Sequence, residues 1–108
     1  MNLTTEIFGA VVVVHAPEEL GGEQADALET CLGRLERNNV VLDLDATETI
    51  DSAGLTALLN AQESFRSLEG DLKISTANAT NRKILEITRL DQTLEVFDSV
   101  IDAVKAFC

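Results

Sequence analysis

The sequence is short of aromatic and basic residues. Its 108 residues include no Trp and no Tyr, and four Phe are the only aromatics, so the core must be built from aliphatic side chains. Eight Lys and Arg stand against nineteen Asp and Glu, and the formal net charge is −11. Such a chain has no basic stripe to neutralise phosphates, and it would be repelled by an anionic membrane surface. We therefore expect no nucleic acid as a partner.

Cysteine and long apolar runs are also scarce. Cys31 and Cys108 are far apart and form no Cys-x-x-Cys pair, and Cys31 falls among apolar helix positions, as an unreactive buried thiol would. No signal peptide is recognisable, and no apolar run approaches the ~20 residues of a membrane-spanning helix. We expect one reduced, cytoplasmic domain over residues 1–108, with no direct membrane insertion.

The spacing of apolar residues predicts strands that alternate with helices. Strands are expected at residues 3–8, 11–15, 40–44, 72–75 and 94–97. Gly9-Ala10 suits a type II′ turn between the first two. Helices are expected between the later strands and at the end of the chain. This order predicts an α/β fold: a mixed, mostly parallel sheet with an antiparallel N-terminal hairpin at its edge and about four helices.

Helix boundaries follow from local signals. The loop Gly21-Gly22 leads into a helix that begins at Glu23 and is expected to close at Asn38. Gly70 is placed to be the C-cap of the following helix. Asp98 is expected to cap the last one.

The stretch from Val40 to Leu68 organises the rest of the chain. A buried strand is followed by a polar loop, then by Asp51-Ser52-Ala53-Gly54 and an amphipathic helix. Ser52 therefore lies at a helix start, beside unpaired backbone N–H groups and the positive end of the helix dipole. Such a position suits a capping serine and equally a phosphate, and the residues alone leave both open.

Catalytic and metal-binding alternatives find little support. Ser52 lacks the first glycine of a G-x-S-x-G elbow, and nothing in the sequence brings His15, the single histidine, to it. The carboxylates of Asp43, Asp45 and Asp51 have neither EF-hand nor Walker-type spacing. A simpler interpretation is that Asp51 caps backbone amides and Asp43 hydrogen-bonds locally. We expect no catalytic residue, metal, cofactor or small-molecule substrate.

The central stretch resembles the signature of STAS domains, the family of bacterial anti-sigma factor antagonists. The resemblance rests on Val40-Val41-Leu42-Asp43-Leu44 followed by Ile50-Asp51-Ser52-Ala53-Gly54-Leu55. Residues 68–74, 81–90 and 96–99 are similar to the family's fourth strand, third helix and final strand. The resemblance implies a STAS-like fold and a binding module that is not an enzyme.

The resemblance also implies a phosphorylation switch. In such antagonists the serine directly after the motif Asp is phosphorylated by an anti-sigma factor that is a serine kinase, and that serine here is Ser52. The unphosphorylated form would bind the kinase and free a sigma factor, and phosphorylation would break the complex. The implied partner-binding residues are Asp51, Ser52, Ala53, Gly54 and Thr56. The alternative is a STAS accessory subunit without a phospho-switch, either in a membrane complex of the lipid-transport type or in a stress-signalling assembly.

Two positions of the motif region carry specific expectations. We expect Gly54 to let the backbone of a partner approach closely, so that Gly54→Val would harm the partner surface more than the helix cap. Arg89 stands where the family usually has a glycine. If that residue is left-handed, arginine costs up to ~1 kcal/mol relative to glycine.

Overall fold

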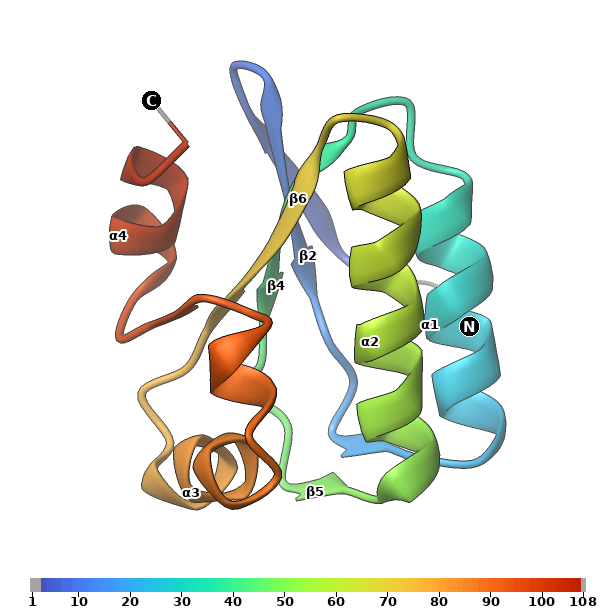
Figure 1. Cartoon of the computed structure of the whole chain (residues 1–108), viewed down its shortest axis with the longest axis vertical. Coiled ribbons are helices and arrows are strands. Elements are labelled where there is room, and N and C mark those ends of the chain that lie inside the picture. The colour runs from blue at the N-terminus through green and yellow to red at the C-terminus, as the bar shows by residue number, and fades with distance from the viewer. Residues whose placement is uncertain (1–2, 108) are drawn as a thin grey trace.

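A five-stranded sheet runs through the centre of the molecule, and helices cover both of its faces (Figure 1). The computed structural model describes residues 3–107. The strand order is β1-β2-β4-β6-β7, formed by Thr5–Phe8, Val11–His15, Asn39–Asp43, Asp71–Ser75 and Val96–Phe97. Strands β1 and β2 pair antiparallel, and the other neighbours pair parallel. The predicted mixed sheet with an antiparallel hairpin at its edge is confirmed.

The helices divide unequally between the two faces. Helices α1 (Glu23–Gly33) and α2 (Ser52–Ser67) lie side by side on one face, and the six-residue α4 (Val100–Lys105) lies on the other (Figure 1). Helix α3 (Ala79–Ile87) packs near the C-terminal ends of β4 and β6, followed by a 3-10 turn at Leu90–Gln92. Among residues 3–107, no helix combines the length and the apolar character needed to cross a membrane.

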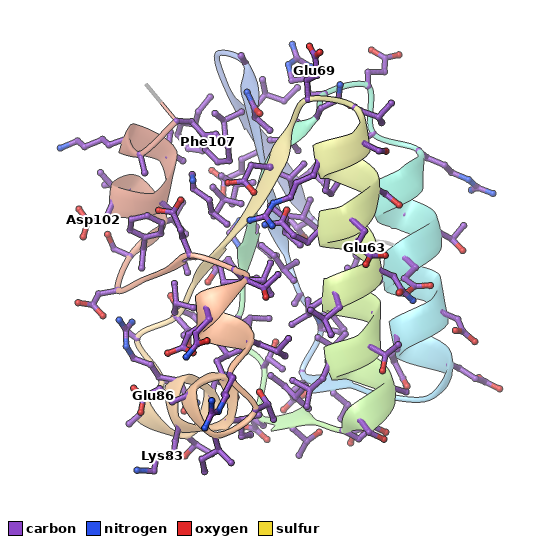
Figure 2. All side chains as sticks on the ribbon, viewed as in Figure 1. Glu63, Glu69, Lys83, Glu86, Asp102 and Phe107 are labelled. Atoms are coloured by element: carbon purple, nitrogen blue, oxygen red, sulfur yellow. The ribbon has the colours of Figure 1, made fainter. Side chains whose placement is uncertain are left out.

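Alternation along the central strands builds two aliphatic cores. Val12, Val14 and the even-numbered side chains of β4 face α1 and α2, in the larger cluster. Val11, Val13 and Val41 face α4, with Val104 and Phe107 packed against them. All four valines of β2 are buried, as expected for a strand covered on both faces. Figure 2 shows Phe107 beside the sheet, where the Lys73 ammonium lies 4.7 Å from its ring centroid.

The hairpin turn and the start of α1 agree with the sequence-based predictions, but α1 is shorter. Gly9 has φ of 61° and Ala10 is not left-handed, as a type II′ turn requires. Helix α1 begins at Glu23 as predicted, yet it ends at Gly33 rather than Asn38, because glycine is a poor residue for a helix interior. Cys31 is half-buried rather than fully enclosed.

The predicted C-terminal cap of α2 and the predicted N-terminal cap of α4 are each wrong by one residue. At the end of α2 the left-handed residue is Glu69, with φ of 63°, and not Gly70. Gly70 is required for another reason, since a Cβ there would collide with the Asn38 carbonyl. At the start of α4 the Ser99 hydroxyl accepts from the Asp102 amide at 3.1 Å, whereas Asp98 forms an ion pair with Arg82.

Arg89, which stands where the resembled family usually has a glycine, adopts the left-handed backbone conformation. Its φ is 62° and its ψ is 19°, immediately after the Thr88 C-cap of α3. An arginine therefore occupies a position that glycine would adopt without a Cβ penalty. The expected cost of arginine relative to glycine at this left-handed position, up to ~1 kcal/mol, therefore applies.

A second, two-stranded sheet was not anticipated. Strands β3 (Glu19–Leu20) and β5 (Thr49–Ile50) pair parallel, with Leu20 opposite Ile50. Each has two residues, which is too short to show a hydrophobic period in the sequence. This pair joins the segment before α1 to the segment before α2, and so fixes the position of the Ser52 corner.

Candidate functional site

The candidate site is the corner where β5 gives way to α2. Asp51 is the N-cap, with extended backbone, and its Oδ1 accepts a hydrogen bond from the Gly54 amide at 3.0 Å. Ser52 is the first helical residue. The prediction that Asp51 caps backbone amides is confirmed, and Ser52 is not itself the cap. The strand-to-helix corner thus leaves the serine hydroxyl uncommitted.

The Ser52 hydroxyl is open to solvent. The residue is exposed, and within residues 3–107 its hydroxyl makes no hydrogen bond. Its backbone carbonyl accepts from the Thr56 hydroxyl at 2.9 Å, which holds the first turn closed. A partner or a modifying enzyme can therefore reach the oxygen of Ser52 without unfolding the helix.

The other predicted binding residues divide into exposed and buried. Asp51, Ala53 and Thr56 are exposed on the same first turn, so the structure brings them together with Ser52. Gly54 is buried, and a Cβ there would collide with the carbonyl of Leu20 and lie 3.2 Å from Ile50 Cγ2. The backbone that approaches Gly54 is thus the chain's own β3. The expectation that Gly54 admits the backbone of a partner is therefore wrong. Gly54 instead allows β3 to pack against the first turn of α2.

Gly21 also contributes to the corner, although the sequence indicated a plain loop. A Cβ on Gly21 would occupy the place of the Asp51 carboxylate, and the Asp51 amide donates to the Leu20 carbonyl at 3.2 Å. Glycine at 21 therefore makes room for the capping carboxylate. No local signal in the sequence could have found this contact, because the two residues are thirty positions apart.

The surroundings of Ser52 are acidic and unpaired. Glu18, Glu19 and Glu48 are exposed on the segments that meet at the β3–β5 pair, and none forms an ion pair in the described part of the chain. A shallow hollow of about 300 Å³ lies beside Asp51, lined partly by Glu19. With no basic side chain paired to it, this corner presents negative charge to a partner.

Within residues 3–107 the Ser52 hydroxyl forms no hydrogen bond to a histidine or a carboxylate. The His15 ring contacts Glu6 and Asp43 on the main sheet and makes no hydrogen bond to Ser52. Two of the carboxylates weighed above as metal ligands accept hydrogen bonds from backbone amides. Asp43 Oδ1 accepts from the Asp45 amide at 3.0 Å, and Asp45 Oδ1 accepts from the Ala77 amide at 2.7 Å. The local hydrogen bonding predicted for Asp43 is confirmed.

Comparison with known proteins adds sequence evidence. The model of the STAS domain family matches residues 2–103. A Thermotoga neapolitana protein, named provisionally as an anti-sigma factor antagonist, is 29% identical over 68 residues, which are 63% of this chain and 60% of that protein. The aligned part therefore spans less than two thirds of that relative. An anti-sigma factor antagonist from Mycobacterium paratuberculosis is 27% identical in its crystal structure, with a TM-score of 0.86 over 97% of this chain and 92% of that one.

Two more distant structures share the fold alone. The Bacillus cell fate determinant SpoIIAA in its phosphorylated form is 14% identical, with a TM-score of 0.72 over 99% of this chain and 100% of that chain. The murine anion transporter Slc26a9 is 15% identical, with a TM-score of 0.75, and the likeness covers 92% of this chain and 18% of the transporter. The fold therefore occurs both in a cell fate determinant and within a membrane transporter.

Proposed function

The chain belongs to the STAS domain family, and we propose that it is an anti-sigma factor antagonist switched by phosphorylation of Ser52. In its unphosphorylated form it binds an anti-sigma factor that is a serine kinase, and so releases a sigma factor in the cytoplasm. The whole chain, residues 1–108, acts as one STAS domain. The observation that carries the proposal is the exposed Ser52 hydroxyl on a corner whose cap is supplied by Asp51.

A phosphate on Ser52 is compatible with the folded chain. Because Asp51 already satisfies the Gly54 amide, modification of the serine removes no capping hydrogen bond. The N-terminal end of the helix dipole favours added negative charge, typically by ~0.3–1 kcal/mol. The residue is exposed, so the phosphate stays in water and demands no repacking. The modified protein keeps its fold.

The same phosphate changes what the corner offers to a partner. It adds a charge of about −1.5 to −2 beside Asp51, Glu19 and Glu48. No basic side chain forms an ion pair with these residues within 3–107, so the added charge is not neutralised by the chain itself. A partner surface shaped around the small, uncharged hydroxyl would have to accommodate the bulk of the phosphate and bear the cost of desolvating it, and the complex would weaken.

The chemistry of phosphorylation belongs to the partner. The Ser52 oxygen forms a bond to the γ-phosphorus of ATP, the bond to the ADP oxygen breaks, and the serine proton passes to a base. The Asp51 carboxylate is held as the helix cap by the Gly54 amide, and the His15 ring is held by Glu6 and Asp43, so we assign the base to the partner. The kinase supplies base, metal and nucleotide, in keeping with a binding module. SpoIIAA, whose fold this chain shares, has itself been obtained in a phosphorylated form.

The test compares charge at two serines of the same helix. Ser52→Asp should weaken capture of the kinase partner at least tenfold, about 1.4 kcal/mol, while far-UV circular dichroism stays that of the wild type. Ser64→Asp, an exposed position farther along α2, is the matched control and should bind normally. Ser52→Ala should bind, yet resist release by ATP. Undiminished binding of folded Ser52→Asp would refute the switch.

A pull-down from native lysate with and without ATP, followed by mass spectrometry of Ser52, identifies the partner class. Phosphate on Ser52 and ATP-dependent release of a kinase support the antagonist. Stable capture of a membrane permease, unaffected by ATP, would instead support the alternative role as an accessory subunit of a lipid-transport type membrane complex.

A further inference from the structure

The single histidine lies between two carboxylates from the two neighbours of its strand. His15 ends β2, and its Nε2 lies 2.6 Å from Oε1 of Glu6 on β1. Its Nδ1 lies 2.8 Å from Oδ2 of Asp43 on β4. The imidazole therefore connects the edge strand of the sheet to a central strand.

The two contacts specify the protonation state of the ring. An ionised carboxylate can only accept hydrogen bonds, and a neutral imidazole has one N–H to donate. Donation to both Glu6 and Asp43 needs the imidazolium, with a proton on each nitrogen. Burial opposes the charged ring, but the hydrogen bonds and charges of Glu6 and Asp43 outweigh it and raise the pKa of His15 above its ordinary value.

Strand β1 depends on this contact more than other strands would. All four of its side chains are exposed, Ile7 by 61%, so burial of apolar surface within the strand holds it weakly. Its sheet partner is β2, on one side. We propose that protonated His15 is a pH-sensitive clasp that fastens the edge strand β1 to the centre of the sheet.

Loss of the proton would act first on the Glu6 side. The Glu6 side chain is 52% exposed and the Asp43 side chain 13%, so Glu6 exchanges its contact for water more easily. Asp43 is also held by the Asp45 amide through its other oxygen. A neutral ring that keeps one N–H would therefore retain Asp43 and release Glu6.

Among residues 3–107, no charged side chain other than Glu6 and Asp43 pairs with the ring. On the β4 side, Asp45 is directed to the Ala77 amide. On α4, the helix covering this face, Asp102 and Lys105 are exposed and make no contact with His15 within residues 3–107. Because the pKa is raised on folding, the stabilisation is complete below the ordinary value of 6.5 and is lost as pH rises through the folded-state pKa.

The presence of one histidine makes the titration unambiguous. In untagged protein a single imidazole Cε1–H signal should appear by NMR, with a titration midpoint above 6.5. Glu6→Gln should lower that midpoint, because it removes one acceptor charge. The control Glu63→Gln makes the same charge change on the exposed face of α2 (Figure 2) and should leave it unchanged. A wild-type midpoint at or below 6.5, or no shift in Glu6→Gln, overturns the clasp.

Hydrogen exchange tests what the clasp holds. Protection factors of the β1–β2 ladder amides, corrected for intrinsic exchange, should fall as pH rises through the histidine midpoint, while those of the β4–β6 ladder do not. His15→Gln should make the β1–β2 values independent of pH over that interval. Equal pH dependence in both ladders, or a β1–β2 dependence that survives in His15→Gln, would refute the proposal.

Discussion

The two ends of α2 both pack closely against backbone from distant segments, but they are capped in different ways. At each end a glycine lies against a carbonyl from a distant segment, Gly54 against Leu20 and Gly70 against Asn38. The N-terminal end is capped by the Asp51 side chain. The C-terminal end is closed by the backbone, through the Gly70 amide to the Phe65 carbonyl at 2.7 Å.

The ends differ in how many polar groups remain free. At the C-terminal end Arg66 donates to the Thr93 carbonyl at 2.9 Å, Asn38 donates to Leu68 at 3.3 Å, and Asp71 pairs with Lys73. At the N-terminal end the Ser52 hydroxyl has no partner in residues 3–107. The C-terminal end, called the tied end below, uses its polar side chains in contacts within the domain. The N-terminal end, called the free end, leaves the Ser52 hydroxyl available to a partner. This contrast is why we assign the partner surface to the N-terminal end.

The largest expected effect is equal at both ends. Gly54→Ala and Gly70→Ala should each lower the free energy of unfolding by about 2–3 kcal/mol, because the new Cβ meets a backbone carbonyl that cannot rotate away. Gly33→Ala is the control, since its Cβ would meet no atom within 4 Å. Thermal unfolding followed by circular dichroism suits a chain without Trp or Tyr. A wild-type melting temperature for either variant would contradict the close approach.

Asp71→Asn should destabilise the protein by removing a charge that forms ion pairs at the tied, C-terminal end of α2. Burial opposes its charge, but hydrogen bonds from Lys73 and Gln62 and the Lys73 and Arg66 charges outweigh it and lower the pKa of Asp71 below 3.8. We expect a loss of about 1–2 kcal/mol at neutral pH, typical of a hydrogen-bonded charge.

This loss depends on pH with a defined sign. The contribution of a carboxylate with a lowered pKa is present above 3.8 and disappears as pH falls through its folded-state pKa. The cost of Asp71→Asn, measured by urea unfolding, should therefore shrink in acid. The control Asp91→Asn, an exposed carboxylate, should show no such trend. A cost independent of pH would argue against the Asp71 ion pair.

Asp51→Ala should remove the side-chain cap at the free end, at a cost of about 1 kcal/mol in urea unfolding. Asp51→Asn keeps an acceptor oxygen and should stay close to the wild type. Ser52→Ala should change stability by less than ~0.5 kcal/mol, because the hydroxyl is exposed and unbonded. If Ser52→Ala cost as much as Asp51→Ala, Ser52 would share the capping role after all.

One small effect should be a gain in stability at the tied, C-terminal end of α2. Glu69→Gly should stabilise by about 0.5 kcal/mol, because relief of the left-handed backbone is partly offset by the greater freedom of glycine in the unfolded chain. Glu69 is exposed in the turn that follows α2 (Figure 2), and its side chain forms no hydrogen bond or ion pair within residues 3–107, so few contacts are lost. Glu69→Ala retains a Cβ and serves as the control, without this gain. Destabilisation by Glu69→Gly would show that its side chain matters more than its backbone.

Local patterns predicted most of the fold. Strand β2 follows from an unbroken run of valines, the start of α1 at Glu23 from loop glycines and the cap at Asp51 from a short-range hydrogen bond. Each lies where the sequence placed it. The end of α1 was placed five residues too late, at Asn38 rather than Gly33, because the helix ends at a glycine. The C-terminal cap of α2 and the N-terminal cap of α4 were each misplaced by one residue, because neighbouring residues offered similar signals. Family resemblance, more than pattern, directed attention to Ser52.

The sequence by itself determined the order of strands and helices, the aliphatic core and a serine at the start of the longest helix, since these depend on residues close together in the chain. Only the tertiary structure decided that β3 pairs with β5, that Gly21 and Gly54 make room for Asp51 and Leu20, and that His15 joins Glu6 to Asp43. These contacts join segments that are distant in sequence. Their geometry exists only once the sheet has assembled and brought the backbones together.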